Sequence, residues 1–230
     1  MIVKTFLGAA LAASSLFAAS SVRAAGNEHV IDDSAVETPG VCHLEAWTTR
    51  FDPRQGLVNL APACTRKAWP RLELGGALER TWAADGASDT LVGPAFKLNL
   101  LPDEKGLGLA LDASAAYGLR AGRMETAALI VPLTLPVGQH LRVNLNAGWS
   151  YSRAAARRNA LFLGAQAELA LPRNLTVMVE TFRRDGSRTG GQLGLRWTPH
   201  DGRLDLDLVA GRRIDGESPR AISLGLTVRR

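Results

Sequence analysis

The sequence lacks the features that usually mark an enzyme or a helical membrane protein. Beyond the N-terminus it has no run of about 18 apolar residues, which excludes a transmembrane helix there. No histidine has a serine and an acid at the spacing of a catalytic triad. Gly-x-Ser-x-Gly and His-Glu-x-x-His are also absent. We therefore expect no catalytic residues, no metal site and no cofactor.

Cysteine is scarce as well, with only Cys42 and Cys64 in the chain. No second cysteine or histidine pair accompanies them, so their spacing is not that of a zinc site. In an exported protein an even cysteine count predicts a disulfide, and two free thiols are the alternative.

The first 25 residues have the composition of a signal peptide. Lys4 supplies a positive charge, residues 6–17 form a short apolar stretch, and Val22 and Ala24 stand at positions −3 and −1 of a cleavage site. The stretch is too short to span a bilayer. We expect cleavage near Ala24 or Ala25, with a retained membrane anchor as the alternative.

Residues 26–68 form a second region. Residues 26–41 are polar and without clear periodicity, which predicts a flexible leader. Residues 42–64 have the pattern of a hairpin that turns at residues 52–56, with the two cysteines at its ends. A hairpin of this size cannot fold alone, so we predict a stapled periplasmic cap or plug beside a larger domain.

From residue 69 to residue 230 the chain shows the regular alternation of β-strands. Apolar residues recur at every second position, not at the helical spacing of three or four. Most segments have the 8–12 residues that suit a tilted strand crossing a membrane, for which about 9–11 are needed. The ten segments are residues 72–79, 92–100, 107–117, 127–135, 141–151, 161–169, 175–179, 193–197, 204–208 and 222–228.

The connections alternate in the same regular way. Every other connection follows a proline at the end of an apolar strand, at Pro102, Pro136, Pro172 and Pro199. The connections between them are longer or rich in arginine and glycine. Bacterial outer-membrane barrels have this asymmetry, with short periplasmic turns on one rim and longer loops on the other.

Together these segments and turns resemble Gram-negative outer-membrane β-barrel proteins. Less specifically, they resemble the small-molecule transport barrels grouped with phenol-degradation outer-membrane proteins. The resemblance covers roughly residues 69–228. It implies an all-β, closed, antiparallel up-and-down transmembrane barrel of about ten strands in the outer membrane. Outer-membrane lipid and the barrel assembly machinery would then be its partners.

The two faces of the strands predict where each side chain points. In such a barrel the Leu and Val face meets lipid and the polar face lines the lumen. A soluble periplasmic β-sandwich, with the apolar face packed on a second sheet, is the structural alternative. The lumen candidates are the charged residues of inward parity, namely Glu73, Glu79, Lys97, Asp112, Arg142, Glu168, Glu180, Arg196, Asp205 and Asp207.

The predicted outer loops are basic. This predicts either a solvated rim or contact with lipopolysaccharide phosphates, which arginine binds well. Nucleic acid is a poor partner, because these arginines sit at separate loop tips without interleaved aromatics. The arginines are Arg120, Arg123, Arg153, Arg157, Arg158, Arg183, Arg184, Arg188, Arg212, Arg213 and Arg220.

We therefore expect a narrow transport or pore-like barrel for small molecules. The first alternative is a structural or interaction protein of the outer membrane. A barrel enzyme that modifies lipid is a second, less favoured alternative. About eight strands give a filled barrel and 16–18 an open channel, so ten strands predict a narrow path. The sequence does not name a solute.

Overall fold

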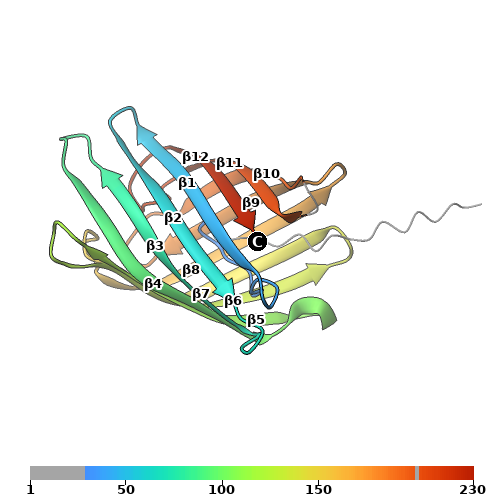
Figure 1. The fold of residues 1–230 in the computed structure, drawn as a ribbon. Coiled ribbons are helices and arrows are strands. Elements are labelled where there is room, and N and C mark those ends of the chain that lie inside the picture. Colours follow the sequence, from blue (N-terminus) through green and yellow to red (C-terminus); the bar gives the residue numbers. More distant parts are fainter. Residues whose placement is uncertain (1–28, 200–201) are drawn as a thin grey trace, which may run out of the picture.

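The computed structural model describes residues 29–199 and 202–230, and they form a closed β-barrel (Figure 1). Each strand pairs antiparallel with its neighbours in sequence, and β1 closes the ring by pairing with β12. The strands are β1 (Cys42–Asp52), β2 (Gln55–Thr65), β3 (Leu72–Trp82), β4 (Ser88–Leu101), β5 (Gly108–Gly118), β6 (Arg123–Val137), β7 (Leu141–Ser152), β8 (Asn159–Leu171), β9 (Leu175–Arg184), β10 (Gly190–Trp197), β11 (Leu204–Arg212) and β12 (Ala221–Arg229). A 3-10 turn, η1 (Asp103–Lys105), joins β4 to β5.

The barrel therefore has twelve strands, and the prediction of about ten was wrong. The two additional strands are the arms of the stapled hairpin, which is part of the wall and not a separate cap or plug. Without β1 and β2, the edges of β3 and β12 would leave backbone groups unpaired, which is costly in lipid. The barrel domain thus begins at Cys42, not at residue 69.

The disulfide prediction is confirmed. Cys42 and Cys64 face each other in the β1–β2 register and are bonded, with their Cα atoms 4.1 Å apart. The bond closes the hairpin at its open end, and a loop of this length contributes roughly 3 kcal/mol in the chain-entropy account.

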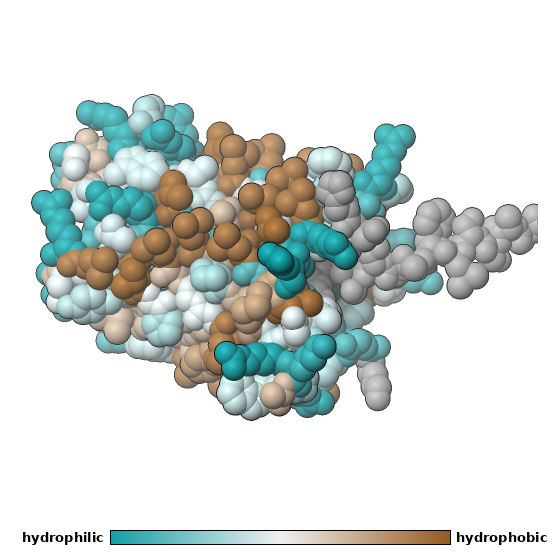
Figure 2. All heavy atoms as spheres, in the orientation of Figure 1, coloured by the Kyte–Doolittle hydropathy of each residue, from teal (hydrophilic) through white to brown (hydrophobic). Residues whose placement is uncertain are grey.

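The predicted alternation of faces is seen directly in β12. Ile222 and Leu224 are exposed on the outside of the barrel, at 59% and 57%, whereas Ser223 and Thr227 are buried inside. The same holds around the ring, where the exposed large side chains are mainly leucines and valines and the buried ones are mainly polar. Figure 2 shows apolar residues over the middle of the wall and hydrophilic residues toward its two ends.

The two rims can be told apart by their connections. At the terminal rim β1 begins and β12 ends, and the connections following Pro102, Pro136, Pro172 and Pro199 all lie there. The arginine-rich connections lie at the opposite rim, which we call the loop rim. The predicted alternation of connections is confirmed. The strands extend further than the periodicity indicated, so the two sets of connections differ less in length than predicted.

Candidate functional site: the polar lumen and its leader

The lumen contains a segment of the chain itself. Residues 29–41, which we call the leader, have no regular secondary structure and cross the interior before reaching β1. Leader residues contact the walls at β9 and β11, then β7, β6 and β4, and finally β3 and β12. The prediction of a flexible leader was therefore wrong for these residues. The signal peptide predicted over residues 1–25 lies outside the described residues.

The first described leader residue, His29, is held between carboxylates. Its Nδ1 lies 2.5 Å from Glu180 Oε1, and its Nε2 lies 3.6 Å from Asp207 Oδ1. Burial lowers the pKa of His29, but the neighbouring carboxylates of Asp207 and Glu180 outweigh it and raise the pKa to about 10. His29 is therefore a cation at neutral pH, and it joins the leader electrostatically to β9 and β11.

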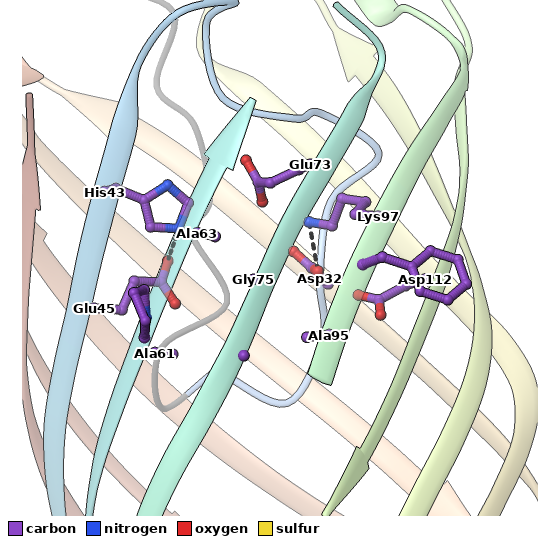
Figure 3. Close-up of a pocket in the computed structure, with 13 residues that line it drawn as sticks. Asp32, His43, Glu45, Ala61, Ala63, Glu73, Gly75, Ala95, Lys97 and Asp112 are labelled. Atoms are coloured by element: carbon purple, nitrogen blue, oxygen red, sulfur yellow. Dashed lines mark ion pairs between the residues drawn. The ribbon is translucent and has the colours of Figure 1, made fainter. Parts of the chain in front are cut away.

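The middle of the leader is held by a second group of charges. Lys97 Nζ, on β4, lies 2.5 Å from Asp32 Oδ2 (Figure 3). It also lies 3.9 Å from Asp33 Oδ1. Arg142 Nη2, on β7, lies 3.4 Å from Asp33 Oδ2 and 3.0 Å from Glu168 Oε2. Two leader acids thus lie between cations on strands from different parts of the wall.

Side chains of the wall also satisfy the leader's backbone. Asn146 accepts a hydrogen bond from the Asp32 amide at 2.9 Å and donates one to the Asp32 carbonyl at 2.7 Å. The Ser34 amide donates to Thr134 Oγ1, and Asn99 donates to the Ser34 carbonyl. Buried backbone groups must be paired, and here wall side chains take the place of a neighbouring strand.

The last part of the leader is fixed near the terminal rim. Arg229 of β12 donates to Glu37 at 2.8 Å and lies 2.7 Å from Asp205. The Glu37 amide donates to Glu73 Oε2 at 2.8 Å. The Gly40 amide then bonds to the Thr65 carbonyl, which leads the chain into β1.

Every residue predicted as a lumen candidate lies at an inward position of its strand. They divide into two groups: Arg142, Glu168, Glu180, Arg196, Asp205 and Asp207 on β7–β11, and Glu73, Glu79, Lys97 and Asp112 on β3–β5. In the first group Arg196 donates to Asp207 at 2.7 Å, and both side chains are at most 1% exposed. In the second group Glu79 faces Asn59 and Leu91 in the strand register.

A cavity of about 160 Å³ lies between the leader and the wall formed by β1–β5. Its ionisable lining residues are Asp32, His43, Glu45, Glu73, Lys97 and Asp112 (Figure 3). Much of the remaining lining is glycine and alanine, including Ala61, Ala63, Gly75, Gly76 and Ala95. These small residues leave space beside the leader.

The sequence reasoning missed the leader's own part in the site. His29, Asp32, Asp33 and Glu37 stand in a segment without periodicity, so nothing local placed them inside the barrel. Their charges were the available signal, because a lumen lined by Lys97 and Arg142 offers partners to acids from elsewhere in the chain.

Within the described residues, no group of three or more His, Cys, Asp or Glu side chains could hold a metal ion. None of the helical segments in that part of the chain has the length and apolar character needed to cross a bilayer.

Comparison with known proteins places the sequence in a family. Residues 13–230 match the family described as Uncharacterised conserved protein UCP029691. The chain belongs to this family. No curated protein matches it.

Solved structures with a similar fold include porins. KdgM porin is 9% identical, with a TM-score of 0.63 over 81% of this chain and 98% of the porin. A second KdgM structure, described as a complex with disordered oligogalacturonate, is also 9% identical, with a TM-score of 0.61 over 82% of this chain and 98% of that chain. NanC porin is 8% identical, with a TM-score of 0.54 over 81% of this chain and 98% of that one. Outer membrane phospholipase A from Escherichia coli is 11% identical, with a TM-score of 0.51 over 86% and 93%. At these identities the likeness concerns the fold.

Proposed function

We propose that this member of the family spans the outer membrane and is a narrow, pore-like protein for small molecules, which the leader closes in the conformation described. The observation that carries the proposal is the arrangement of the barrel, with leucine and valine outside and buried charge inside. A closed barrel of this kind leaves no unpaired strand edge in lipid. A soluble barrel would place its polar face outside.

The size of the barrel supports a narrow path. Twelve strands lie between the roughly eight of a filled barrel and the 16–18 of an open channel. The leader takes up part of that interior and is held to the wall mainly by ion pairs and hydrogen bonds. Contacts of this type exchange with water more readily than a packed apolar core, so the leader is suited to move aside.

Ser34 and Gly108 allow a direct test, because a Cβ added at Gly108 would lie 3.3 Å from the Ser34 Cβ. A disulfide needs a Cβ–Cβ distance of about 3.5–4.5 Å. The added Cβ would also lie 2.8 Å from the Asp103 Cβ, so Asp103 or the start of β5 must shift for the double variant Ser34→Cys/Gly108→Cys to tie the leader to β5. In planar bilayers we expect the oxidised variant to block ion conductance and the reduced variant to restore it. The two single-cysteine variants and the wild type, with and without reductant, are the controls.

Conductance that is equal in the oxidised and reduced states would exclude the leader as the closing element. A complete lack of conductance in every form would exclude the pore. Each sample is first checked by gel migration with and without boiling, because a closed barrel resists detergent and shifts on heating.

The interaction hypothesis is the second candidate, and the loop rim favours it. Arg183 and Arg212 are exposed there, at positions that alternate with inward residues and so point toward the lipid headgroups. We expect Arg183→Ala/Arg212→Ala to weaken binding to lipopolysaccharide but not to its dephosphorylated form. The matched control is Arg173→Ala/Arg203→Ala, which removes exposed arginines near the terminal rim.

Two further proposals concern the export of the chain and the absence of catalysis. Export through a cleaved signal peptide and insertion by the barrel assembly machinery follow from the outer-membrane location. Kinship with the phenol-degradation group stays a prediction. The protein is proposed to be non-enzymatic, and lipid modification that depends on one His or Ser would contradict this.

A further inference from the structure

We infer that the lumen selects cations, so that the solutes it admits are small molecules carrying an ammonium or guanidinium group. This inference rests on the proposed pore and names the class of its solute. It is argued from the charge of the interior, from the partners of its cationic residues and from the cavity beside the leader.

The interior is strongly acidic. The only Lys and Arg side chains that face it in the middle and terminal-rim parts of the described barrel are Lys97, Arg142, Arg196 and Arg229. The carboxylates that face the same space are Asp32, Asp33, Glu37, Glu45, Glu73, Glu79, Asp112, Glu168, Glu180, Asp205 and Asp207. Even with His29 charged, carboxylates outnumber cations about two to one, so the potential inside is negative.

The cationic side chains are already engaged. Arg196 pairs with Asp207, Arg229 with Glu37 and Asp205, and Arg142 with Glu168 and Asp33. Lys97 pairs with Asp32 and Asp33 of the leader. An anionic solute would have to compete with these carboxylates for each cation, at the cost of leaving a buried carboxylate unpaired.

Carboxylates of the wall and of the leader line the cavity. Glu45, Glu73 and Asp112 line it from β1, β3 and β5, and the leader adds Asp32. One water occupies about 30 Å³ in the liquid, so 160 Å³ holds a few waters or one small cationic head group. Lys97 and His43 are the basic residues of its lining.

The net charge of the interior is negative, whereas the net charge of the whole chain is positive. The sequence carries a net charge of +5, much of it from arginines in the loop-rim connections. The acidic lumen is therefore a local feature of the fold. Oligogalacturonate, described in complex with KdgM, is an acidic sugar polymer, and its carboxylates would meet like charge here.

The test is the reversal potential of the full mature chain in a planar bilayer under a KCl gradient. We expect K⁺ to permeate about tenfold more readily than Cl⁻, because several surplus charges act over a few ångströms. The variant Glu73→Gln/Asp112→Asn keeps the hydrogen-bonding shape and replaces two carboxyl groups with amides, and we expect it to lower this ratio about fivefold. The matched control Asp215→Asn/Glu217→Gln neutralises two exposed acids at the loop rim and should leave the ratio unchanged.

The outcomes separate this inference from the proposed function. Conductance with equal or anion-favouring permeability in the wild type would overturn cation selection and leave the pore standing. Absence of conductance in the wild type and in every variant, in samples whose barrels shift on heating, would overturn the pore itself. Because the wild type alone decides the sign, the test does not depend on the folding of any variant.

Discussion

Asp33 offers the most direct way to release the leader. Its side chain is 1% exposed and lies between Arg142, 3.4 Å away, and Lys97, 3.9 Å away. Asp33 Oδ1 also accepts a hydrogen bond from the Ala35 amide at 3.0 Å. The variant Asp33→Ala removes these contacts while leaving the strands of the barrel unaltered.

The expected magnitude follows from these contacts. Truncating one partner of a buried, hydrogen-bonded charge pair costs about 2–5 kcal/mol. The lower part of that range applies here, because Lys97 keeps Asp32 and Arg142 keeps Glu168 as partners. A loss of about 2–3 kcal/mol from the closed state raises the population with a released leader by roughly 30- to 140-fold.

Single-channel recording measures this population as the fraction of time spent at the open level. The control is Asp215→Ala, because Asp215 bonds only within its own connection at the loop rim, to Glu217 and Ser218 among the described contacts. An unchanged open fraction in Asp33→Ala, with normal migration on heating, would show that these ion pairs do not hold the pore closed.

Two further predictions concern the buried charges around His29. Arg196→Met leaves Asp207 buried without its main partner and should destabilise the barrel by about 3–5 kcal/mol, measured by urea unfolding from micelles. The double variant Arg196→Met/Asp207→Leu should recover most of this loss, because it also removes the buried carboxylate of Asp207. Equal stability of the single and double variants would refute this coupling. Charged His29 faces Glu180 and Asp207, with Arg196 opposing it, and its pKa of about 10 lies above the ordinary histidine value of 6.5. The stability that this charge gives is therefore complete below pH 6.5 and is lost as the pH rises through 10. Protease cleavage of the leader should increase over that alkaline range, and a His29→Gln variant with the same pH profile would contradict the assignment.

The wall of the barrel was largely predictable because its signal is local. Successive side chains of a strand point to opposite faces, so the position of Leu224 and Ser223 in the alternation predicts which of them lies outside and which inside. The same parity predicts that Lys97 and Asp207 point inside. The two cysteines at the hairpin ends likewise indicated a bond that the β1–β2 register confirms.

The hairpin shows where local pattern was insufficient. Its arms alternate as the other strands do, with Leu44 and Leu60 outside and Glu45 and Asn59 inside. Its role depended on β1 pairing with β12 at the far end of the chain, which no local pattern encodes. The physical reason for that pairing is closure, because a sheet in lipid cannot leave an edge unpaired.

The sequence by itself determined the inside and outside of the wall, the order of turns and the disulfide, because each rests on neighbours in the chain. Only the tertiary structure decided that twelve strands close the ring and that the leader lies within it. The leader has no periodicity to predict a path, and its position depends on Lys97, Arg142 and Asn146, which come together only when the barrel has closed.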